Sequence, residues 1–285
     1  MAEIERYVAR ADVRVAAAVA NETSPFNIEV RFLGGLTDRQ KDAFKSAADR
    51  WSRMIVGDLP SVVVDGEVID DVLILAQGQA IDGPGRILGQ AGPTRLRPRN
   101  AGNAAFIPAK GTMAFDTADL QDMEQRGTLN DVITHEMGHV LGIGTIWMQK
   151  RLLQGAGTAN PTFTGRTAEA EYGRLRNLGP TPVPVENMGG PGTADSHWRE
   201  SVFGNELMTG FVAAALNPLS RMTVASLQDL GYVVNLNAAE PYNLPNHLEM
   251  AEAGLLMAPE AHVRTGMMLP NIPLVLPEES LRNAV

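Results

Sequence analysis

Residues 135–139 read His-Glu-Met-Gly-His, the HExxH pattern, inside the segment Leu129–Leu141, whose sequence predicts a helix. Positions four residues apart lie about 40° apart around a helix, so His135 and His139 project from one face and can share one Zn²⁺. Glu136 lies one step further round, where its carboxylate can take a proton from a water on the metal instead of binding the metal. The pattern therefore predicts a zinc centre with Glu136 as its catalytic base.

A catalytic zinc needs a third protein ligand and one open position. In the compact form of the motif the third histidine follows the first by ten residues, and here that position is Thr145. Gly142 is present where the helix would have to end sharply, because glycine readily adopts the left-handed conformation. His197 lies 58 residues beyond His139, just past a glycine-rich loop. We expect His197 to be the third ligand.

Other residues remain open as the third ligand. Glu169 or Glu171, on a downstream predicted helix, would complete a His₂Glu site. The sequence lacks the Asn-Glu pattern with a trailing Asp that such sites normally show. His247 and His262 lie in an irregular C-terminal region, where a surface histidine is the simpler interpretation.

The order of these elements resembles that of the leishmanolysin-like metalloproteases, a branch of the metzincins. The resemblance rests on residues 135–142, an insertion before His197, and the sequence Glu-Leu-Met-Thr-Gly at 206–210, and it spans roughly residues 27 to 235. Metzincins carry a methionine turn beneath the zinc ligands, and Met208, eleven residues after His197, looks like it. The resemblance implies an α+β zincin fold of the metzincin type, with a twisted mixed sheet, an active-site helix and a less regular C-terminal subdomain.

Three parts of the chain are expected on this basis. They are an N-terminal extension over residues 1–25, a catalytic subdomain over 26–144 with the HExxH helix, and a C-terminal subdomain over 145–285 with the third ligand and the methionine turn. Parasite members of the family are rich in disulfides and carry a cysteine that confers latency, whereas this chain has no cysteine. Their anchoring and their latency mechanism cannot be carried over.

Hydrophobic periodicity predicts the regular elements around this motif. A capping box formed by Thr37 and Gln40 marks the start of one amphipathic helix. Residues 92–110 contain three prolines and little periodicity, which predicts a loop. The predicted strands are 27–33, 62–64, 72–75 and 86–91 of one sheet, with 111–115 as a possible edge strand, and the other predicted helices are 117–127, 166–177 and 223–230.

Composition excludes several classes of protein. The net charge of −9 has the wrong sign for a surface that must neutralise phosphates, so we expect no nucleic-acid partner. No apolar run approaches the roughly 18 residues of a transmembrane helix. The first twenty residues show no cleavable signal peptide, which leaves the location unknown because leaderless export and a cytoplasmic location both fit.

A second cation site has weaker support. Asp82, in an Asp-Gly-Pro-Gly turn, could join Asp116 and Asp119 around a hard cation such as Ca²⁺. A turn aspartate and a pair of residues at a helix N-terminus explain the same sequence equally well.

The function we expect is zinc-dependent hydrolysis of internal peptide bonds, with protein or peptide substrates. The strand at 111–115 could align an extended peptide by backbone pairing. Alternatives are a noncatalytic binding module stabilised by zinc, a His₂Glu hydrolase, and zinc hydrolysis of a nonpeptide amide. The intact Glu136 argues against the first alternative, because a structural zinc site has no use for a base.

Overall fold

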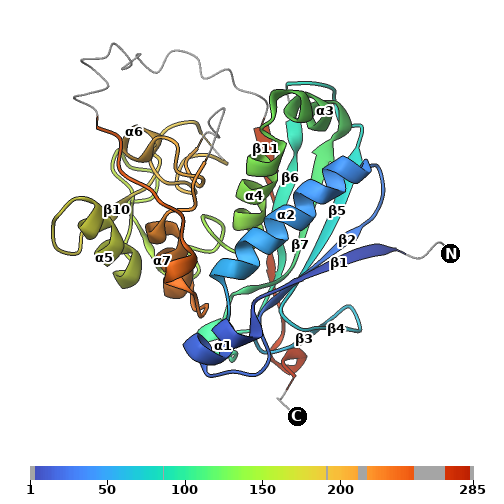
Figure 1. Ribbon diagram of the computed structural model, residues 1–285, viewed down its shortest axis with the longest axis horizontal. Helices are drawn as coiled ribbons and strands as arrows, with labels where there is room; N and C mark the ends of the chain where they lie inside the picture. Colours follow the sequence, from blue (N-terminus) through green and yellow to red (C-terminus); the bar gives the residue numbers. More distant parts are fainter. Residues whose placement is uncertain (1–3, 86, 191, 211–216, 247–266, 283–285) are drawn as a thin grey trace.

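The fold is built on a mixed sheet of seven strands, seen nearly edge-on in Figure 1. The computed structural model describes residues 4–85, 87–190, 192–210, 217–246 and 267–282. The strands run in the order β1-β2-β5-β7-β6-β11, with β12 also paired to β6. Their bounds are β1 (Glu5–Arg10), β2 (Asn27–Phe32), β5 (Val72–Gln79), β6 (Ile87–Leu96), β7 (Pro108–Asp116), β11 (Met267–Pro270) and β12 (Leu274–Val275).

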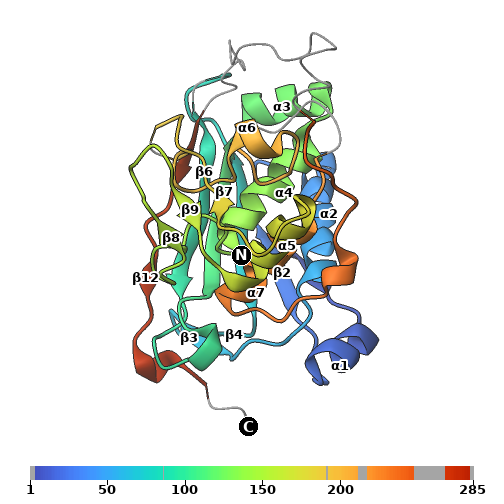
Figure 2. The same cartoon turned by 90° about the vertical axis from the view of Figure 1, so that its left-hand side faces the viewer.

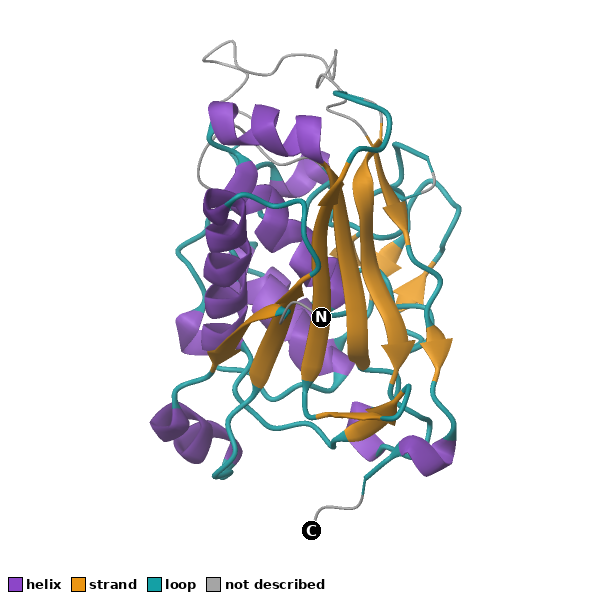
Figure 3. Ribbon diagram, turned by 90° about the vertical axis from the view of Figure 1, so that its right-hand side faces the viewer, coloured by secondary structure: helices purple, strands orange, loops and turns teal. Residues whose placement is uncertain are grey.

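Two long helices lie on one side of this sheet (Figures 1 and 3). Helix α2 (Asp38–Met54) begins at the predicted capping box, in which Thr37 and Gln40 each accept a hydrogen bond from the other's backbone N–H. Its buried stripe includes Trp51, whose indole N–H donates to the carbonyl of Thr134 at 2.9 Å. Thr134 lies in α4 (Leu129–Val140), so this bond ties the predicted zinc-binding helix to α2.

The chain beyond α4 is less regular. Its helices gather beside α4, on the side of it away from β1 (Figure 1). Short strands and connecting loops make up most of the rest. The remaining elements are α1 (Val13–Ala20), α3 (Thr117–Arg126), α5 (Arg166–Leu175), α6 (Glu200–Phe203), α7 (Arg221–Leu230), β3 (Val62–Val64), β4 (Glu67–Ile69), β8 (Leu153–Gln154), β9 (Thr162–Phe163), β10 (Val183–Pro184) and the 3₁₀ turns Gly102–Ala104, Leu236–Ala238 and Glu278–Ser280.

The expected twisted mixed sheet with an associated helix is present, but three predictions about strands were wrong. Residues 111–115 are not an edge strand, because β7 pairs with β5 on one side and β6 on the other. Residues 62–64 form a separate hairpin with β4 instead of joining the main sheet. The predicted loop 92–110 is shorter, since β6 continues to Leu96 and accommodates Pro93 at a shift of its register with β7.

Both ends of the described chain contribute to the main sheet. Strand β1, inside the expected N-terminal extension, pairs antiparallel with β2. Strands β11 and β12, inside the expected C-terminal subdomain, pair parallel with β6, and Figure 2 shows β12 beside β6. The predicted division at residues 25 and 144 stays a prediction, and these three strands lie across it. No helix within the described ranges has both the length and the apolar character needed to cross a bilayer.

Candidate metal centre

Helix α4 presents His135 and His139 together, as their spacing predicts. Their Nε2 atoms lie 3.0 Å apart, and both rings are more than nine-tenths buried. The helix stops directly after them, because Gly142 adopts φ 111°, a conformation that favours glycine. Buried Tyr232 donates from its hydroxyl to the carbonyl of Leu141 at 2.8 Å, which fixes the end of the helix.

His197 completes a triad with these two residues. Its Nε2 lies 3.1 Å from that of His135 and 3.0 Å from that of His139. The loop before it is closed by backbone bonds, from Glu186 N to the carbonyl of His197 and from Asp195 N to the carbonyl of Glu186, both at 2.9 Å. The structure therefore brings a residue from a distant loop to the face of α4.

The other ring nitrogen of each histidine faces a backbone carbonyl. Nδ1 lies 2.6 Å from Leu207 O in His135, 2.8 Å from Ile143 O in His139 and 2.9 Å from Thr193 O in His197. A carbonyl only accepts, so each Nδ1 carries the proton and each Nε2 presents a lone pair.

Three lone pairs converge with no hydrogen between them. This arrangement is repulsive on its own, and it suits a cation that accepts imidazole nitrogen. Burial lowers the pKa of His135 to about 3, with His139 adding to the effect, and lowers that of His139 to about 4. Burial also lowers the pKa of His197 well below its ordinary value. The three rings are thus neutral at physiological pH, as metal ligands must be.

Glu136 lies beside the triad on the same helix and is 7% exposed. Burial raises the pKa of its carboxyl to about 8. A bound cation beside this carboxyl would favour its ionised form, and a carboxylate in so dry a place takes up a proton more readily than one in water, which is the property that a general base needs.

Met208 packs against the middle of the HExxH sequence. It is fully buried, and a Cβ placed on Gly138 would lie 2.8 Å from its sulfur. Its neighbour Leu207 supplies the carbonyl that faces His135. The methionine predicted to lie beneath the metal ligands is therefore in contact with the helix that carries His135 and His139.

Comparison with known proteins matches these same elements. A sequence model described as Leishmanolysin matches residues 104–249, just over half of the chain, a range that includes α4, His197 and Met208. The chain belongs to the leishmanolysin family. It is also 31% identical over 150 residues to the ciliated left-right organizer metallopeptidase of Xenopus laevis. That match covers 45% of this chain and 21% of the relative, so the aligned part of the chain spans about a fifth of that protein's length.

The structure gives no support to the other residues considered as the third ligand. Glu171 is paired with Arg174 and with Arg221, whose Nε lies 3.0 Å from a carboxylate oxygen, and Glu169 lies on the same helix α5. His247 and His262 lie outside the described residues. Among the described side chains, the group that converges with His135 and His139 contains His197.

The structure gives the calcium prediction no support. One carboxylate oxygen of Asp116 accepts from the backbone N–H of Ile81, Asp82 and Gly83, and the other accepts from Ala118 at the start of α3. Asp119 accepts from Gly85 N at 2.8 Å. These bonds fit the simpler interpretation, in which the aspartates cap a helix and a turn.

Sequence reasoning missed the groups that orient the histidines of this leishmanolysin-family site. The acceptors are the backbone carbonyls of Leu207, Ile143 and Thr193, which carry no signature in the sequence. The side chain of Glu206 also went unassigned, although it stands two residues before Met208 in the matched pattern. A buried acid at that place is the one signal that could have pointed to it.

Proposed function

We propose that the protein is a zinc-dependent endopeptidase, with His135, His139 and His197 as metal ligands and Glu136 as the catalytic base. The observation that carries this proposal is the convergence of three Nε2 lone pairs at 3.0–3.1 Å, each with its Nδ1 proton held by a carbonyl. Membership of the leishmanolysin family supports a metalloprotease with protein or peptide substrates. The metzincin type of zincin fold belongs to the same proposal.

The chemistry divides between the metal and Glu136. When bound, Zn²⁺ acts as a Lewis acid that makes a water more acidic and polarises the scissile carbonyl. Glu136 accepts the proton of the attacking water as the new C–O bond forms, and then delivers it to the leaving amine as the C–N bond breaks. Each turnover returns the carboxylate to its starting state.

The structure changes one part of the expected substrate contact. Backbone pairing with residues 111–115 is not available to a peptide, because both edges of β7 are already paired. The outer edge of β6 is paired with β11 and β12 over residues 87–91 and 95–96. Substrate alignment by the main sheet is therefore not part of the proposal.

Replacement of Glu136 by Ala tests the base. We expect zinc content to stay near one ion per chain while hydrolysis of casein falls by at least about 10²–10⁴-fold, the usual contribution of general acid–base catalysis. Metal analysis of the purified protein and a casein digest measure the two quantities. Unchanged hydrolysis would refute the role given to Glu136.

Replacement of His197 by Ala tests the third ligand. We expect zinc affinity to fall by more than the roughly 10–100-fold that follows loss of a group that only orients a ligand. Glu171→Ala is the control, because Glu171 is buried in the same part of the chain but is paired with arginines. A loss of zinc in the Glu171 variant but not in the His197 variant would move the site to the His₂Glu class.

The rival is a noncatalytic module that keeps zinc for stability. It predicts zinc binding and zinc-dependent unfolding with no cleavage in a broad peptide-library digest. If the substrate is a nonpeptide amide, we likewise expect no cleavage of peptides in this digest. The presence of Glu136 beside the triad favours the endopeptidase over the module.

A further inference from the structure

Glu206 is a completely buried carboxylate two residues before Met208, and it accepts hydrogen bonds from two elements. One oxygen accepts from the backbone N–H of Met208 at 2.7 Å. The other accepts from Ser220, through its backbone N–H at 3.0 Å and its hydroxyl at 2.7 Å, and from the hydroxyl of Thr223. The carboxylate thus joins the turn that carries Met208 to the N-terminus of α7.

The turn held by Glu206 touches the sites of two of the histidines. The carbonyl of Leu207 faces Nδ1 of His135 at 2.6 Å. The carbonyl of Met208 accepts from the backbone N–H of Trp198, the residue after His197, at 3.0 Å. A shift of this turn would move the acceptor of one ring and the backbone next to another.

A second set of hydrogen bonds connects Glu206 to Trp198, the residue after His197. The Thr223 hydroxyl that donates to Glu206 also accepts from the indole N–H of Trp198 at 2.8 Å. Trp198 is fully buried and stacks on Trp147 with ring centroids 4.8 Å apart. Glu206 therefore restrains Trp198 both through the turn and through Thr223.

We propose that Glu206 is a positioning residue that sets the orientation of His135 and His197 for metal binding, through the Leu207–Met208 turn and Trp198. This inference rests on the proposed role of the histidines as zinc ligands. Groups that orient metal ligands commonly contribute 10–100-fold to metal affinity.

Replacement of Glu206 by Gln breaks this connection with little change of shape. Each carboxylate oxygen accepts a fixed backbone N–H, one from Met208 and one from Ser220. A glutamine side chain has one carbonyl oxygen and one NH₂ group. Whichever way it is placed, one of the two backbone N–H groups faces another donor and loses its acceptor.

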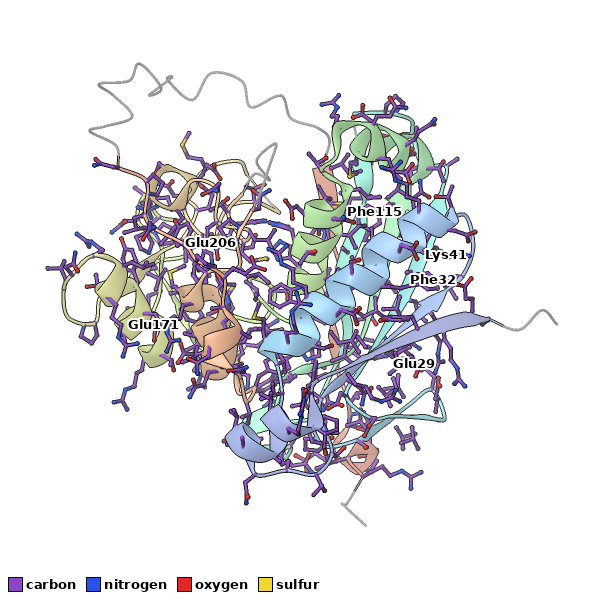
Figure 4. All side chains as sticks on the ribbon, in the orientation of Figure 1. Glu29, Phe32, Lys41, Phe115, Glu171 and Glu206 are labelled. Carbon is purple, nitrogen blue, oxygen red and sulfur yellow. The ribbon has the colours of Figure 1, made fainter. Side chains whose placement is uncertain are left out.

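The matched control is Glu171→Gln. Glu171 is also a buried glutamate, and it contacts Arg221 at the start of the same helix α7. Its partners are the side chains of Arg174 and Arg221, and none of its hydrogen bonds within the described chain reaches the turn at Leu207 and Met208. Figure 4 labels both glutamates and shows Glu171 on the outer helix α5, further from α4 than Glu206.

The experiment measures zinc affinity of the full chain by competition with a chelator, and the absorption spectrum of the Co²⁺-substituted protein. For Glu206→Gln we expect affinity to fall by about 10-fold or more and the Co²⁺ bands to shift. For Glu171→Gln we expect wild-type affinity and an unchanged spectrum, even where the melting temperature of the apoprotein falls. Equal loss of affinity in both variants, or wild-type affinity and spectrum in Glu206→Gln, would overturn the inference.

A second pair of variants decides the matter if Glu206→Gln does not fold. Thr223→Val removes the hydroxyl between Glu206 and Trp198, whereas Thr223→Ser keeps it. We expect Thr223→Val to bind zinc several-fold more weakly and Thr223→Ser to restore the wild-type affinity. Identical affinity in the two variants contradicts the inference. Wild-type protein that fails to bind zinc would instead refute the proposed function itself, so the two failures are distinguishable.

Discussion

The three histidines are held in place by two regions whose backbones are stabilised by different kinds of hydrogen bond. His135 and His139 lie on α4, a regular helix packed on α2 through apolar side chains and one indole bond. His197 lies in a loop, where buried carboxylates that accept backbone N–H groups take the place of a helix. Glu186 is such a carboxylate, since it accepts from Asn187, Met188 and Glu200.

The difference shows how an irregular segment can hold a histidine in place without the internal hydrogen bonds of a helix. A helix satisfies its backbone groups internally, so the spacing of its ligands is fixed by the sequence alone. A loop leaves backbone N–H groups without partners, and buried side chains must supply acceptors. We therefore expect substitution of the loop-region acids that accept backbone N–H groups to affect zinc binding, and substitution of acids in the first region to affect mainly stability.

The largest effect is expected where the two regions touch, at Gly144. A Cβ on Gly144 would lie 2.0 Å from the carbonyl oxygen of Ser196, directly before His197, and Gly144 has φ 75°. We expect Gly144→Ala to lower the free energy of unfolding by about 2–5 kcal/mol through left-handed strain and overpacking. It should also abolish measurable zinc binding, because Ser196 and His197 must move.

Gly157→Ala is the control for this prediction. Gly157 has φ 73° but no atom within 4 Å of its Cβ position. We expect a cost of about 1–2 kcal/mol from backbone strain alone, with zinc affinity unchanged. Chemical denaturation and chelator competition measure both variants. Equal zinc affinity in the two alanine variants would contradict the prediction that the close packing of Gly144 on Ser196 is needed for zinc binding.

A smaller effect is expected for Glu186→Gln, which tests the loop region itself. The amide would leave at least one of the three backbone N–H donors without an acceptor, at a cost of about 1–3 kcal/mol in the free energy of unfolding. Zinc affinity should fall as well, because the backbone of Glu186 is bonded to that of His197.

Glu22→Gln provides the matched change outside the loop. Glu22 accepts from the backbone N–H of Asp58 at 2.7 Å, away from the triad. The amide oxygen of a glutamine can still accept this single bond, so we expect little loss of stability and no change in zinc affinity. If Glu186→Gln and Glu22→Gln bind zinc equally well, buried acceptors do not hold the third ligand.

The smallest effect is expected for Asp116→Asn, in the first region. Burial opposes ionisation of Asp116, but the backbone N–H groups of residues 81, 82, 83 and 118 outweigh it and lower its pKa. A lowered folded pKa adds stability above the ordinary pKa of 3.8, and this stability is lost as the pH falls through the folded value. We expect the variant to be about 1 kcal/mol less stable at pH 7.

The pH dependence checks the cause of that difference. Denaturant unfolding of both proteins between pH 5 and pH 3 should show the difference becoming smaller as the pH falls. A difference that stays constant or grows over this range would contradict the role of the ionised carboxylate. Zinc affinity of Asp116→Asn at pH 7 should match the wild type, because the hydrogen-bond donors to Asp116 are residues 81, 82, 83 and 118, outside the loop region.

Many helices and strands of the first region could be predicted because the sequence patterns that specify them are local. The capping box at Thr37, the helix from Leu129 and the strand from Asn27 are confirmed, and each depends on residues within a few positions of one another. The predicted position of β7 at the edge of the sheet was wrong, because strand order depends on pairing with segments far along the chain. Strands β11 and β12 were missed, since short strands in a proline-rich segment show little periodicity.

The sequence alone determined the pair His135 and His139 with Glu136 beside it, because four-residue spacing on a helix fixes which side chains share a face. It narrowed the third partner to a few residues and favoured His197. Only the tertiary structure decided which of the described candidates meets the pair, and which carbonyls and carboxylates hold it there. The physical reason is that a loop takes its conformation from hydrogen bonds to distant elements, and no local pattern records them.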